Sequence, residues 1–71
     1  MNKSRTVELI REGKYIAEVE VELLEDETAW SPYLTPEGVE KLDAVRFALR
    51  AGDVKAATQQ AKVYEMVPVG V

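Results

Sequence analysis

The stretch Lys14–Glu25, KYIAEVEVELLE, decides how the rest of the chain has to be arranged. Apolar side chains occupy every second position, and the positions between them hold Glu18, Glu20 and Glu22. The apolar positions are Tyr15, Ala17, Val19, Val21 and Leu23. A period of two predicts a strand with one buried and one solvent-facing side. The remaining segments are therefore expected to cover its apolar side.

A first strand is predicted over Ser4–Arg11, immediately before this stretch. Glu12-Gly13 lies between the two strands, and a Gly at the second central position suits a two-residue hairpin loop. A longer loop with a bulge is the alternative, because Glu is a poor first residue for that turn. The sequence thus predicts an antiparallel hairpin over residues 4–25.

The two-residue loop fixes a register that can be tested against charge. It places Arg5 opposite Glu20, which is a favourable pair on the solvent-facing side. It also places Arg11 opposite Lys14, and this pair of like charges argues mildly against the register.

This register leaves three apolar residues, Val7, Leu9 and Ile16, on the side that carries the glutamates. Because two helices can cover only one side of a hairpin, this second patch needs another cover. A homodimer built on the strands is predicted, with Leu9 and Ile16 near its two-fold axis. The alternative is that the C-terminal tail of the same chain folds back over the patch.

Residues 26–35 form a loop that is more apolar than a plain linker, because it contains Trp30 and Tyr33. One interpretation is that these aromatic rings fold back as a lid on a small core. The other is that they are exposed anchors for a partner, since such residues dominate the energies of interfaces.

Two helices are predicted next, over residues 36–51 and 54–64. Thr35 suits an N-cap, and Pro36 suits the first position of a helix. Gly52 suits the position after a helix end, and Asp53 can cap the second helix. The apolar residues Val39, Leu42, Val45 and Leu49 recur at helical spacing and predict the buried face of the first helix.

The tail over residues 65–71 is predicted to be extended, with a short third strand as an alternative. Pro68 would confine such a strand to an edge of the sheet, because proline has no N–H for a ladder. The whole chain is thus predicted to be one α+β domain, residues 1–71. It consists of a two-stranded hairpin, packed against an antiparallel pair of helices.

Composition excludes several kinds of chemistry. The chain has 71 residues, a net charge of −4, no Cys and no His, so thiolate and histidine catalysis are absent. No catalytic, cofactor or metal site is predicted, and the protein is not expected to be an enzyme. No apolar stretch is long enough to span a membrane, and no signal peptide is evident, so a small cytoplasmic protein is expected.

Charge bears on the choice of partner. No Lys or Arg occurs between Tyr15 and Glu40, where the acidic residues gather. Such a surface repels nucleic acid and would suit a basic protein, although a merely solvated acidic edge is the simpler interpretation. The segment around Gly52 resembles a DNA-binding helix-turn-helix, with Lys55, Gln59, Gln60 and Lys62 in the second helix, but Asp53 stands where that motif needs an apolar residue.

The run LDAVRFALRAGDVKAA, residues 42–57, resembles one helical hairpin of the tetratricopeptide kind, although no repeat follows it. Taken together with YIAEVEVELLED and WSPYLTPE, it resembles a group of short bacterial proteins, some of which are antitoxins. A hairpin followed by a helix is also similar to small antitoxins of the HicB type, but their third strand and Gly-Cys segment are missing here.

This resemblance implies a non-catalytic bacterial protein-binding module, antitoxin-like in role, and it transfers no functional residues. The candidate contacts to a basic partner come instead from the acidic strand and the aromatic loop: Glu18, Glu20, Glu22, Trp30 and Tyr33. The alternatives are a DNA-binding regulator and a self-associating structural protein without a ligand.

Overall fold

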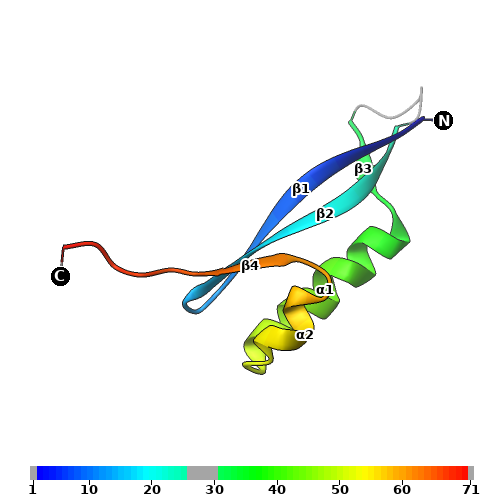
Figure 1. Ribbon diagram of the computed structural model, residues 1–71. Coiled ribbons are helices and arrows are strands. Elements are labelled where there is room, and N and C mark those ends of the chain that lie inside the picture. Colours follow the sequence, from blue (N-terminus) through cyan, green and yellow to red (C-terminus); the bar gives the residue numbers. More distant parts are fainter. Residues whose placement is uncertain (1, 26–30, 71) are drawn as a thin grey trace.

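The protein is described by a computed structural model, which covers residues 2–25 and 31–70. Its elements are the strands β1 (Asn2–Glu12), β2 (Tyr15–Glu25) and β3 (Tyr33–Leu34), the helices α1 (Pro36–Arg50) and α2 (Val54–Thr58), and the strand β4 (Lys62–Glu65). The strands form one antiparallel sheet, and both helices lie on the same side of it (Figure 1). The predicted α+β class is confirmed. The sheet has four strands rather than the two that were predicted for the hairpin.

β2 is the central strand, as its alternating pattern predicts. β1 pairs with one edge of it along the full length of both strands. The other edge is shared, because β4 pairs with Tyr15–Glu18 and β3 pairs with Leu23–Leu24. Segments that are far apart in the sequence therefore meet on β2.

A gap between β3 and β4 on that edge is filled by groups from the start of α1. The backbone N–H of Thr35 donates to the carbonyl oxygen of Glu22 at 3.3 Å. The ammonium group of Lys41 donates to the carbonyl oxygen of Glu20 at 2.8 Å. These bonds hold α1 against β2 where no strand is present.

The predicted register of the hairpin is wrong by two residues. Glu12 pairs with Tyr15, so the two-residue loop is Gly13-Lys14. Gly13 has a φ of +59°, whereas Lys14 does not have a positive φ. A type II′ turn needs positive φ only at its first central residue, so Gly in that place avoids the strain that Glu12 would have met in a type I′ turn.

The shift leaves every side chain on the side of the sheet that was predicted, because only a shift by one residue exchanges the two sides. Ala17, Val19 and Val21 are buried beneath the helices, together with Ile10 of β1. Val45 and Leu49 of α1 and Ala57 of α2 complete this core. The core is small and lies entirely between the sheet and the helices.

Both predicted ends of α1 are confirmed. The hydroxyl oxygen of Thr35 accepts from the N–H of Gly38 at 3.0 Å, and Pro36 is the first helical residue. At the other end, Gly52 has a φ of +77° and its N–H donates to Leu49. Asp53 donates its N–H to Ala48, which completes a Schellman motif.

The predicted buried face of α1 needs one correction at its start. Val39 is 44% exposed, and Gly38 is buried in its place. A Cβ atom at Gly38 would lie 3.2 Å from the Thr35 hydroxyl and 3.5 Å from the Cβ of Val21. The helix therefore lies close to β2 at a residue without a side chain.

The second helix is much shorter than predicted, since α2 ends at Thr58 rather than at residue 64. Lys62–Glu65 instead forms β4, so the predicted short strand exists but begins before residue 65. Val63 pairs with Ala17 on the helix side of the sheet. Pairing with the second edge of β2 satisfies backbone groups that a longer helix would have left without partners, and it outweighs the weak helical pattern.

Candidate binding surface

The side of the sheet opposite the helices is called the open face here. It carries Glu18, Glu20 and Glu22 of β2, as the alternating pattern predicts. Because side chains alternate between the two faces of a strand, the register places further side chains beside them. They come from β1 (Lys3, Arg5, Val7, Leu9 and Arg11) and from β4 (Lys62 and Tyr64). The acidic row of β2 is therefore flanked by basic residues on both sides.

An apolar stripe crosses this face diagonally. It consists of Val7, Leu9, Ile16 and Tyr64. Ile16 pairs with Tyr64 of β4 on one side and with Arg11 of β1 on the other. Leu9 is the next residue of β1 whose side chain lies on the same face. Val7 is 52% exposed and Leu9 is 63% exposed. The three residues predicted as a dimer contact therefore do lie on one surface.

Two of the three glutamates already have partners within the chain. The guanidinium group of Arg5 lies 3.0 Å from the carboxylate of Glu20. This pair was predicted, but in the observed register it is a diagonal contact, because Arg5 pairs with Glu22 across the strands. Both side chains are more than half exposed, so the pair contributes little stability.

Glu18 interacts with Tyr64 across the β2–β4 pair. The pKa of Tyr64 is raised above its ordinary value of 10.0, because hydrogen bonding to the Glu18 carboxylate and its negative charge both favour the neutral phenol. The pairing of β4 with β2 places Tyr64 directly beside Ile16.

The two aromatic residues predicted as partner anchors have different outcomes. Trp30 lies outside the described residues. Tyr33 pairs with Leu24 and is 45% exposed on the open face, so its ring is not a lid on the core.

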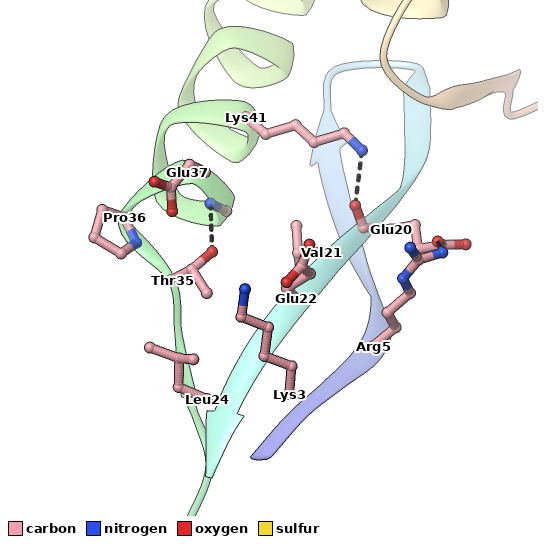
Figure 2. Close-up of a pocket in the computed structure, with 11 residues that line it drawn as sticks. Lys3, Arg5, Glu20, Val21, Glu22, Leu24, Thr35, Pro36, Glu37 and Lys41 are labelled. Atoms are coloured by element: carbon pink, nitrogen blue, oxygen red, sulfur yellow. Dashed lines mark hydrogen bonds and ion pairs between the residues drawn. The ribbon is translucent and has the colours of Figure 1, made fainter. Parts of the chain in front are cut away.

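A cleft of about 480 Å³ lies where the sheet meets the start of α1 (Figure 2). Its polar walls carry cations and carboxylates in equal number: Lys3, Arg5, Lys41, Glu20, Glu22 and Glu37. Lys41 reaches across the cleft to the backbone of Glu20, and Thr35 caps α1 beside it (Figure 2). Two polar side chains of the cleft thus serve α1, since Lys41 bonds it to β2 and Thr35 caps its start.

A second, shallower cleft of about 600 Å³ lies at the tip of the hairpin, between Gly13 and the tail residues Met66–Pro68. The tail is pinned there, because Met66 donates its N–H to the Lys14 carbonyl at 2.6 Å. The Lys14 ammonium group lies 3.1 Å from the carboxylate of Glu65. Beyond this point the tail runs away from the sheet (Figure 1), and Val69 is 98% exposed.

The structure removes the basis of the helix-turn-helix interpretation. Lys55 is the only one of its four candidate residues that lies within a helix, because α2 has five residues. Gln59 and Gln60 follow the helix end, and Lys62 belongs to β4. A recognition helix that fills a major groove is therefore not formed by this segment.

Within residues 2–25 and 31–70, no three acidic side chains lie close enough together to hold a metal ion. No helix in that part of the chain is both long and apolar enough to cross a membrane. Comparison with protein-family models, curated proteins and solved structures finds no match to this chain.

The sequence interpretation placed Arg5, Val7 and Leu9 on this face, but it did not recognise that the residues of β1 there form one continuous row. The odd-numbered residues of β1 alternate as Lys3, Arg5, Val7, Leu9 and Arg11. This is the same period of two that revealed β2, with cations at both ends and apolar residues at the centre. The signal was present but was interpreted only as a patch in need of a cover. Tyr64 was missed because it was assigned to a helix.

Proposed function

We propose that the protein is a non-catalytic protein-binding module that holds its partner on the open face. The observation that carries this proposal is the exposed apolar stripe, which no element within the described residues covers. Leu9 at its centre is 63% exposed. Apolar patches ringed by polar residues mark interaction sites on soluble proteins.

The exposed area of the whole chain is also larger than that of a compact monomer. The chain exposes 5390 Å², whereas a compact monomer of 7.9 kDa would expose about 4400 Å². The excess of about 1000 Å² is shared between the projecting tail, the long hairpin and the open face (Figure 1), and an interface of standard size would bury a similar area on one partner. A chain with this much surplus surface gains stability when a partner covers it.

The test compares two substitutions at equally exposed apolar residues. Leu9 on the open face and Phe47 on α1 are both 63% exposed. A partner is first captured with the parent chain and purified. Its affinity for the Leu9→Asp and Phe47→Asp variants is then measured by calorimetry. The proposal predicts that Leu9→Asp weakens binding and that Phe47→Asp does not. Equal affinities for both variants would contradict it.

Antitoxin-like action is the specific form of this proposal that the sequence resemblance supports, and it includes a cytoplasmic location. The partner would then be a small basic toxin. Such a partner would have to compete with Arg5 for Glu20 and with Tyr64 for Glu18, whereas Glu22 has no ion pair within the described residues. Calorimetry with the product of a neighbouring gene tests this form, and a loss of binding in Glu22→Gln is expected.

Self-association is the second candidate, and the observation that favours it is that the tail leaves the patch uncovered. Leu9 and Ile16 are diagonal neighbours, so both can lie near one two-fold axis. Light scattering at tens of micromolar is expected to give a dimer mass for the parent chain and a monomer mass for Ile16→Glu. A monomer mass for both would leave a different protein as the occupant of the open face.

A further inference from the structure

The outer edge of β1 is long and regular. β1 has 11 residues, and within the described part of the chain it pairs with β2 alone. Its register continues without interruption from Asn2 to Glu12, so no bulge breaks the edge, and the strand contains no proline. An edge of this kind can accept another extended segment through backbone hydrogen bonds.

The bonds on the far side of β2 show which residues of β1 point outward. The carbonyl groups of Lys14, Glu20 and Glu22 all accept hydrogen bonds from the side opposite β1. By the alternation of an antiparallel ladder, the odd-numbered residues of β2 bond to β1, where their partners are even-numbered. The odd-numbered residues of β1 therefore direct their own N–H and C=O groups to the free edge. They form an outward row: Lys3, Arg5, Val7, Leu9 and Arg11.

The outward row combines two features on the same residues. Its backbone groups are available for a ladder, and its side chains lie on the open face. Val7 and Leu9 supply exposed apolar side chains at its centre. Lys3 and Arg11 supply exposed cations near its two ends. Arg5 is already paired with Glu20.

We propose that the free edge of β1 binds an extended antiparallel segment of another protein, which places an acidic residue opposite Arg11, apolar residues opposite Leu9 and Val7, and an acidic residue opposite Lys3. This inference rests on the proposed function and names the mode of binding and the chemistry of the partner. An added strand lies about 5 Å from β1 and about 10 Å from β2. Its acids would therefore be closer to the cations of the outward row than to the glutamates of β2.

A second copy of β1 does not meet this requirement. Two copies paired about a two-fold axis bring their outward rows together, and these rows contain no acidic residue. With Val7 on the axis, for example, Lys3 stands opposite Arg11 of the other copy. The other registers set a cation against a cation, or against Val or Leu. Such pairs are unfavourable, so charge complementarity selects a different protein.

The test uses a fluorescent nine-residue peptide with the sequence Glu-Thr-Val-Thr-Val-Thr-Ser-Thr-Glu, whose alternate residues match the outward row. Fluorescence anisotropy is expected to show saturable binding to the parent chain. A peptide with Lys in place of both Glu residues is expected to bind about tenfold more weakly. The double variant with Lys3→Glu and Arg11→Glu is expected to reverse this preference.

Methylation of the peptide nitrogens separates edge pairing from contact with the open face. Methyl groups on the two Val nitrogens remove N–H groups that face β1, and a loss of about tenfold is expected. Methyl groups on two of the four Thr nitrogens, all of which point away from β1, are the control, and they are expected to change little.

Three results would overturn the inference: no saturable binding, equal binding of the Glu and Lys peptides, or equal loss with both methylation patterns. If binding is insensitive to methylation but is lost in Leu9→Asp, the partner contacts the open face without extending the sheet. In that case the proposed function stands and the edge inference fails.

Discussion

Tyr64 and Glu18 provide a measurable contact at the scale of single residues. Because the pKa of Tyr64 is raised in the folded chain, this contact stabilises the fold fully below the ordinary pKa of 10.0. The stabilisation is lost as the pH rises through the raised pKa. The same sign holds for Lys14, whose pKa is raised by its hydrogen bond and charge interaction with Glu65.

Glu18→Gln is expected to bring the pKa of Tyr64 back towards 10.0, because it removes the negative charge that opposes the phenolate. The titration of the Tyr64 ring carbon by NMR measures this shift. Glu22→Gln is the matched control on the same strand and is expected to leave the titration unchanged. An unshifted titration in Glu18→Gln would show that Tyr64 does not face Glu18.

Thr35 is a buried polar residue with an identifiable role, since its hydroxyl oxygen caps α1. Thr35→Val keeps the shape of the side chain but removes the acceptor, and it is expected to cost about 1 kcal/mol of stability. Urea unfolding measures this loss. Thr35→Ser retains the hydroxyl and is expected to cost less, so equal costs for both variants would argue against the cap.

Single residues were predictable where their partners are close in sequence. The cap from Thr35 to Gly38 spans three residues, as does the cap from Asp53 to Ala56, and both were inferred from local pattern alone. The bond from Lys41 to the Glu20 backbone spans 21 residues. Nothing in the sequence around Lys41 indicates that a gap in a sheet edge lies within its reach.

At the scale of elements, β2 and α1 were predictable because their periods are sustained over several turns or pairs. The register of the hairpin was not predictable, because the predicted loop Glu12-Gly13 and the observed loop Gly13-Lys14 both contain Gly13. The conformation of Gly13 decides between them. Residues 62–64 of β4 were assigned to the second helix, because the edge of β2 that pairs with Val63 exists only in the folded chain.

The packing of α1 shows which of its two core-facing leucines matters more. Leu49 is 4% exposed, whereas Leu42 is only partly buried against the core. Leu49→Ala is therefore expected to cost about 2–5 kcal/mol, and Leu42→Ala is expected to cost less. Urea unfolding of both variants checks the order. Phe47→Ala is the control for an exposed position of the same helix, and a larger loss there than in Leu49→Ala would contradict the packing.

At the scale of the whole molecule, the chain is more extended than a compact domain of its length. Its radius of gyration is 14.3 Å, against about 11 Å for 71 residues in a compact fold. The long hairpin and the projecting tail account for the difference (Figure 1). The sequence indicated a surface in need of a cover, but the position of the open edge became evident only once β4 was placed on β2.

Amide hydrogen exchange along β1, measured by NMR on the free chain at a concentration where light scattering gives a monomer mass, tests the open edge most directly. The even-numbered residues Thr6, Glu8 and Ile10 bond to β2 and are expected to exchange slowly. The odd-numbered residues Val7, Leu9 and Arg11 point outward and are expected to exchange fast. Equal protection of both sets in the monomer would show that the edge is covered by the chain itself, and it would contradict the account.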